Sequence, residues 1–176
     1  MRYGRFLTAL ALPLAFIAAP THAVDTTTEG GWEFTLAGVG NSNDNVDAGS
    51  FNAEISLAAL IGPNFSLGAR QSGSYNDANA GTAWNGSTRA FLDFQFNLGR
   101  FAPFVGANLG YVYGDTTADT WVAGPEAGVK FYLGETSDVF LYGRVEYQFF
   151  FDKGDAVDDV FDDGQFLYTL GLGLRF

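Results

Sequence analysis

The clearest strand pattern in the chain runs from Gly164 to Phe176 and reads GQFLYTLGLGLRF. Read with the two-residue period of a β-strand, one face is wholly apolar and runs from Phe166 to the terminal Phe176. The other face includes Gln165 and Arg175. A tilted strand that crosses a bilayer needs ~9–11 residues with an apolar outer face and a polar inner face. The stretch has these properties, and the rest of the chain repeats them.

Seven further segments alternate in the same way, separated by connections that are by turns long and short. We expect strands at residues 31–39, 51–60, 65–74, 88–98, 101–113, 121–133, 139–151 and 165–176. An even number of strands, short turns at one end and long loops at the other are typical of outer-membrane barrels. We therefore predict an all-β protein: an eight-stranded antiparallel up-and-down transmembrane β-barrel over residues 24–176, with both termini in the periplasm. Pro125 is awkward for a fully paired strand and suggests a bulge.

The N-terminus has the pattern of a secretory signal. Arg2 and Arg5 precede an apolar run from Phe6 to Ile17, and Thr21-His22-Ala23 forms a small-residue cleavage site. The run is shorter than the ~20 apolar residues of a spanning helix. We expect residues 1–23 to be a cleaved signal peptide, and an N-terminal anchor is the alternative.

Composition argues against several functions. Without residues 1–23 the chain has seven Lys and Arg against 20 Asp and Glu, a net charge of −13. We expect no nucleic-acid binding, because that relies on basic residues. There is no Cys, and the one His, His22, lies in the expected signal peptide. Without a His general base we expect no enzyme activity and no catalytic residue. We expect no cofactor or metal site either, although the acidic loop from Asp152 to Asp163 leaves weak binding of divalent cations open.

Three pieces of the chain carry a family resemblance: PFVGANLGY at residues 103–111, GPEAGVKF at 124–131, and the terminal Phe176 after alternating hydrophobic residues. With them the chain resembles the small eight-stranded outer-membrane β-barrel superfamily that includes OmpA-, OmpX- and OmpW-like proteins. The resemblance implies a monomer in the cell outer membrane of a Gram-negative bacterium, in contact with membrane lipid and lipopolysaccharide. It also implies that the barrel-assembly machinery recognises Phe176 during insertion.

The alternation assigns most of the charged strand residues to the inner face. They are Glu33, Glu54, Arg70, Arg89, Asp93, Glu126, Lys130, Arg144, Glu146 and Arg175. Side chains fill an eight-stranded barrel, and an unpaired charge there would cost several kcal/mol. We therefore predict a salt-bridge network that plugs the lumen, with a gated pore or proton path as the alternative.

Register suggests partners within this network. Counting from the Pro63 turn puts Glu54 opposite or diagonal to Arg70, and counting across the next loop puts Arg70 near Asp93. Closure of the barrel makes Glu33 and Arg175 neighbours.

Outward aromatic residues gather near the strand ends. We expect a membrane-interface girdle that includes Trp32, Tyr111, Tyr113, Trp121, Tyr147, Phe149, Tyr168 and Phe176. A ligand-stacking surface is the alternative interpretation.

Two functions agree with these patterns. The first is a structural or surface-interaction role, in envelope integrity or through adhesion-type loops. The second is a narrow, porin-like pore or lateral-exit transporter for small or hydrophobic solutes, as the likeness to OmpW-like barrels implies. The sequence points to no particular ligand or host target.

Overall fold

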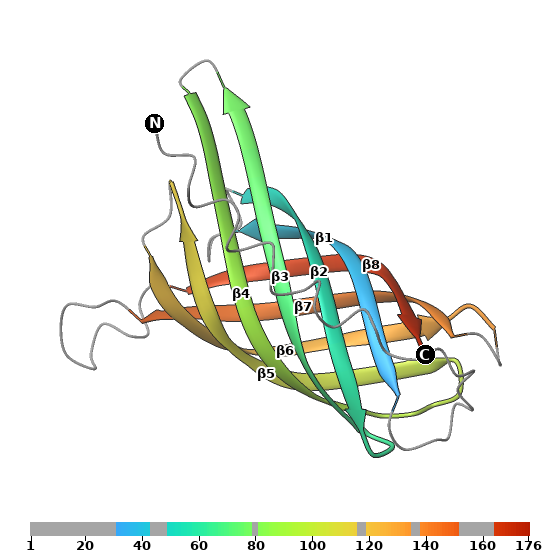
Figure 1. Ribbon diagram of the computed structural model, residues 1–176. Helices are drawn as coiled ribbons and strands as arrows, with labels where there is room; N and C mark the ends of the chain where they lie inside the picture. Colours follow the sequence, from blue (N-terminus) through green and yellow to red (C-terminus); the bar gives the residue numbers. More distant parts are fainter. Residues whose placement is uncertain (1–30, 43–48, 79–80, 116–118, 135–137, 152–163) are drawn as a thin grey trace.

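The computed structural model describes residues 31–42, 49–78, 81–115, 119–134, 138–151 and 164–176. They form eight antiparallel strands in a closed barrel, in which each strand pairs with the next and β8 pairs with β1 (Figure 1). The strands are β1 (Trp32–Ser42), β2 (Gly49–Ile61), β3 (Phe65–Ala78), β4 (Gly81–Gln95), β5 (Phe101–Gly114), β6 (Thr120–Tyr132), β7 (Val139–Phe151) and β8 (Gly164–Arg175). The predicted fold class is confirmed. The expected signal peptide and acidic loop lie outside the described residues.

Strands β1 and β8 close the barrel in continuous register from Glu33 opposite Arg175 to Ser42 opposite Phe166. Two backbone hydrogen bonds end this seam. The Trp32 N–H donates to the Phe176 carbonyl at 2.7 Å, and the Phe176 N–H donates to the Trp32 carbonyl at 2.9 Å. No edge strand is left unpaired along the seam, which is the condition for a sheet to cross a bilayer.

The barrel is polar inside and apolar outside. Leu170 is 73% exposed on the outer face, whereas Arg70 and Glu54 inside are 2% and 1% exposed. This arrangement suits a wall that faces lipid. Within the described residues no helix is long and apolar enough to cross a membrane.

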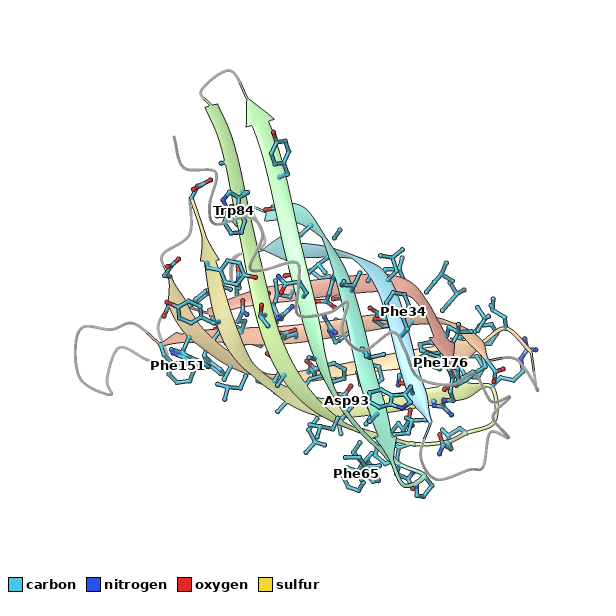
Figure 2. All side chains as sticks on the ribbon, in the orientation of Figure 1. Phe34, Phe65, Trp84, Asp93, Phe151 and Phe176 are labelled. Carbon is cyan, nitrogen blue, oxygen red and sulfur yellow. The ribbon has the colours of Figure 1, made fainter. Side chains whose placement is uncertain are left out.

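One end of the barrel carries tight turns, and we call it the turn end. Gly62 and Gly99 occupy these turns with φ of 69° and 67°, a backbone region that favours glycine. The opposite end is the open end. Figure 2 shows Phe65 and Phe176 toward the turn end and Trp84 and Phe151 toward the open end.

The long connection that the expected strands leave between residues 74 and 88 is wrong. Strand β3 continues to Ala78 and β4 begins at Gly81, with Tyr75 directly opposite Trp84. The Ser, Asn, Thr and Gly residues of this segment pair as a hairpin, although their composition is typical of a loop. The hairpin extends beyond the last residues that pair with β2 and β5, which are Gly73 and Asn85 (Figure 1). At its other end β4 stops at Gln95 instead of the expected residue 98.

Pro125 does not create the expected bulge. The pairs Ala123–Phe149 and Glu126–Glu146 on either side share one register, so neither strand carries an extra residue. The two intervening residues of β6, Gly124 and Pro125, make no ladder pair with β7. Proline lacks the N–H that the ladder would need there.

Because the outer face is apolar and faces lipid, the loss of unfolding free energy caused by a charge on this face should depend on its depth in the bilayer. Leu170→Arg lies mid-strand and should lower the free energy of unfolding by ~2–4 kcal/mol. Leu174→Arg, on the same strand and face but next to the turn end, should cost about 0–1 kcal/mol. Urea unfolding in lipid vesicles measures both. Equal costs would contradict the assignment of this face to lipid.

The charged lumen as candidate functional site

The charged side chains of the lumen form two groups. The central cluster consists of Glu54, Arg70, Arg89, Glu126, Arg144 and Glu146. The seam cluster, nearer to the turn end, consists of Glu33, Lys130 and Arg175. The side chains of the central cluster are at most 5% exposed and those of the seam cluster at most 8%.

The central cluster places like charges side by side on the barrel wall. Arg70 on β3 lies directly opposite Arg89 on β4, and Glu126 on β6 lies opposite Glu146 on β7. Directly opposed like charges destabilise a sheet. Here the two arginines and the two glutamates face one another across the lumen, so that each repulsive wall pair meets charges of opposite sign.

Short ion pairs cross the lumen between these walls. Arg70 holds Glu126 through both terminal nitrogens, at 2.6 and 2.8 Å, and Arg89 Nη1 donates to Glu146 Oε1 at 2.5 Å. The first is a two-pronged guanidinium–carboxylate pair, the geometry with the greatest directional specificity. The Asn108 side-chain amide adds a donor to Glu126 at 2.7 Å.

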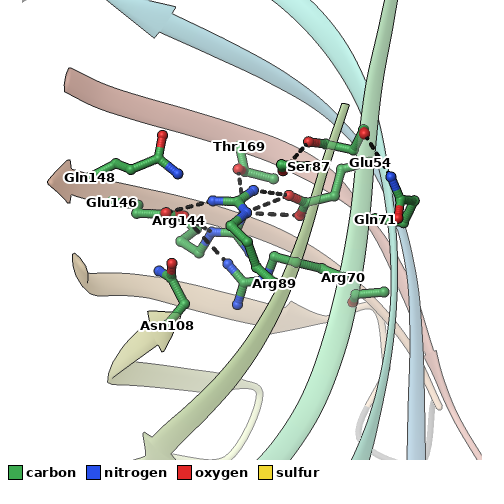
Figure 3. Close-up of polar contacts among 12 residues, drawn as sticks. Glu54, Arg70, Gln71, Ser87, Arg89, Asn108, Arg144, Glu146, Gln148 and Thr169 are labelled. Atoms are coloured by element: carbon green, nitrogen blue, oxygen red, sulfur yellow. Dashed lines mark hydrogen bonds and ion pairs between the residues drawn. The ribbon is translucent and has the colours of Figure 1, made fainter. Parts of the chain in front are cut away.

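Glu54 on β2 links these cross-lumen ion pairs to Arg144 on β7. It accepts from Arg89 Nη2 at 2.7 Å and from Arg144 Nη2 at 2.9 Å (Figure 3). Arg144 also donates to the Thr169 hydroxyl at 2.9 Å. The hydrogen bonds of the central cluster therefore connect side chains from β2 to β8 across the interior.

The seam cluster joins β1, β6 and β8. Glu33 accepts from Lys130 Nζ at 2.5 Å and from Arg175 Nη2 at 2.6 Å. Aromatic rings cover the cations: Lys130 Nζ lies 5.5 Å from the centre of the Phe140 ring, and the Arg175 guanidinium 5.1 Å from that of Tyr132. Cation–π contacts of this kind gain strength where water is excluded.

The predicted partners agree only in part with this geometry. The structure places Glu33 beside Arg175, and Glu54 is diagonal to Arg70, but Glu54 pairs with Arg89 and Arg144 instead.

Arg70 and Asp93 are not opposite each other in the ladder, although their side chains interact electrostatically, as the expected proximity requires. Asp93 lies opposite Ser66, whereas Arg70 lies opposite Arg89. Counting across the misassigned loop displaced the register by four residues. The carboxyl group of Asp93 shares a hydrogen bond with that of Glu126, which links Asp93 to the central cluster.

Several neutral residues of the interior were not anticipated as partners. Asn108 and Thr169 bind the central cluster, and Gln148 accepts a hydrogen bond from Gln165 at 2.6 Å. All four have the inward parity that selected the charged residues, so the same pattern could have found them. Arg100 lies at the turn end, where its guanidinium is 5.0 Å from the centre of the Phe131 ring.

The predicted girdle residues all take outward positions. Tyr111 packs against Trp121 with ring centres 5.6 Å apart, and Tyr147 against Phe149 at 4.8 Å. Tyr113 packs against Trp84, and Tyr168 is 42% exposed. These six predicted residues lie toward the open end, whereas Trp32 and Phe176 close the seam at the turn end.

The described part of the chain offers no metal centre, because no three His, Cys, Asp or Glu side chains in it are grouped to hold an ion. The charged side chains of the lumen instead link the strands to one another through ion pairs.

No protein-family model matches the chain, and no curated protein matches its sequence. Solved structures do share the fold. Neisserial surface protein A (NspA) is similar with a TM-score of 0.60 at 17% identity, over 85% of this chain and 98% of that chain. The outer membrane protein OprG from Pseudomonas aeruginosa is similar with a TM-score of 0.58 at 9% identity, over 84% and 96%. Ail, the attachment invasion locus protein of Yersinia pestis, is similar with a TM-score of 0.50 at 13% identity, over 85% and 100%.

These similarities and the closed eight-strand topology show the fold of the small eight-stranded outer-membrane β-barrels, as the sequence resemblance implied. Strands of such barrels cross the membrane.

The cross-lumen pairing predicts strong coupling between Arg70 and Glu126. Arg70→Met or Glu126→Met alone leaves a buried charge without its partner and should cost ~3–5 kcal/mol of unfolding free energy. The double substitution should cost much less than the sum of the two, because both charges are removed together. Chemical unfolding in detergent micelles measures this cycle.

Arg100→Met, at an exposed turn, serves as the control and should cost about 1 kcal/mol or less. Additive single costs would show that the pair does not stabilise the barrel as a unit.

Proposed function

We propose that this chain is a non-enzymatic structural protein of the outer membrane, with a lumen closed to solutes and with connections at the open end available for surface interactions. The observation that carries the proposal is the central cluster, in which three cations and three carboxylates from strands around the barrel pair across the lumen. Opening a path would separate buried charges, which is costly.

The neighbours support the surface role. One of the similar solved structures is named for attachment and invasion. We propose export through the N-terminal signal, with both termini in the periplasm and with insertion through recognition of Phe176 by the barrel-assembly machinery. The outward apolar belt then contacts membrane lipid and lipopolysaccharide, and the barrel is a monomer.

A closed lumen predicts electrically silent protein. Purified wild-type barrel in planar bilayers should give no stable conductance steps, because no continuous water path passes the central cluster. Single-channel recording tests this, with a porin of known conductance as the positive control. Stable open events in the wild type would overturn the closed lumen and leave the fold unaffected.

A second function, lateral exit of small or hydrophobic solutes into the bilayer, is favoured by one observation. The strand pairing between β6 and β7 is interrupted at Gly124 and Pro125, beside the lumen residue Gln148. The Asn108 amide approaches the Gly124 carbonyl at 3.4 Å, but Asn108 belongs to β5, so this contact does not bridge the interruption between β6 and β7. This is where the wall has the fewest backbone bonds between the two strands.

The lateral path predicts that Pro125→Val, which restores an N–H to β6, reduces uptake of a hydrophobic solute by cells that express the barrel. Pro103→Val is the matched control, because Pro103 lies in the neighbouring strand opposite Val129, outside the interruption between β6 and β7. Equal uptake by both variants and the wild type would count against the lateral path.

A further inference from the structure

The lumen is hollow between the central cluster and the open end. A cavity of about 170 Å³ lies there, with Arg89 and Gln148 on the side of the cluster and Ser72 and Ser87 in the wall. Figure 3 shows Ser87 and Gln148 beside the charged side chains. Such a cavity is large enough to hold several water molecules or one small solute.

The cavity suits an uncharged ligand. Arg89 is the one charged residue among the described residues that line it, and its guanidinium is already balanced by Glu146 at 2.5 Å and Glu54 at 2.7 Å. An anionic ligand would draw Arg89 away and leave a buried carboxylate unpaired. A cationic ligand would be repelled by the positively charged guanidinium of Arg89. The lining therefore disfavours both signs of charge.

The polar part of the lining consists of hydroxyl and amide groups. Ser72 and Ser87 share a hydrogen bond of 2.7 Å, and Gln165 donates to Gln148 at 2.6 Å. Hydroxyl oxygens both donate and accept, so they can match the hydroxyls of a solute.

The remaining lining is apolar and comes from β1, β5, β7 and β8. Its side chains are those of Val39, Val112, Phe150 and Leu167, and Gly73 and Gly86 add backbone to the wall. A pocket with an apolar wall and a few converging polar groups is the usual form of a small-molecule site. Sugars and related polyols match it, because their C–H faces are apolar and their edges carry hydroxyls.

We propose that this cavity binds a small uncharged polyhydroxylated solute of monosaccharide size, which enters from the open end. The site goes beyond the structural role proposed above. It does not require passage, because the central cluster lies between the cavity and the turn end.

The test is an NMR titration of the isotope-labelled full barrel in micelles with glucose, and with gluconate and glucosamine as anionic and cationic analogues. Glucose should give saturable shifts at Ser72, Ser87 and the Gln148 side-chain amide, and the charged analogues should not. Ser87→Leu, which fills the cavity, should abolish the shifts. Thr88→Leu is the matched control, because this neighbouring residue is exposed on the outer face, and it should leave them unchanged.

Heat-dependent gel mobility checks that both variants fold. If Ser87→Leu does not fold, Gln148→Ala replaces it and should weaken binding. Absence of saturable shifts in the wild type, equal shifts with the charged analogues, or shifts that persist in folded Ser87→Leu would each overturn the site. Ion current through the wild type would overturn the closed lumen, while saturable glucose shifts would still support the cavity.

Discussion

The structure depends on the pairing of charges across the lumen. Side by side on the wall, Arg70 and Arg89 repel each other, as do Glu126 and Glu146. Only a closed barrel brings the two arginines and the two glutamates within bonding distance, since β3 and β4 are not adjacent to β7. Closure and charge pairing therefore stabilise each other, and an open sheet of the same strands would keep the repulsion and lose the attraction.

Charge pairing also holds strands together at the turn end. Glu33 draws together Lys130 of β6 and Arg175 of β8, beside the backbone hydrogen bonds that complete the seam. Phe140, fully buried, lies against Lys130 and helps to keep water from this level. The lumen thus changes along its length, from ion pairs under aromatic rings, through the central cluster, to a hollow lined by serine and glutamine. The closed part supports the proposed structural role, and the hollow part leaves room for the proposed solute.

Alternation was enough to predict the architecture from the sequence. It gives the number of strands, the inward position of all ten predicted charges, and the neighbours Glu33 and Arg175, because adjacent positions follow from a period of two and from closure. The partners across the lumen depend on the shear of the barrel, which links strands that are far apart in the chain. The pair Arg70–Glu126 spans three strand boundaries, so no local pattern reveals it. The sequence does not predict the hairpin over residues 73–86, because its composition is typical of a loop and its apolar residues do not alternate.

Closure of the lumen at the level of the central cluster can be tested by the accessibility of single introduced cysteines, because the chain has no native Cys. Ser72 and Ser66 both point inward from β3; Ser72 lines the cavity, and Ser66 lies on the far side of Arg70. Intact cells that display Ser72→Cys or Ser66→Cys would be treated with a membrane-impermeant thiol reagent. We predict rapid labelling of the first variant and none of the second. Comparable labelling of both would contradict a closed lumen.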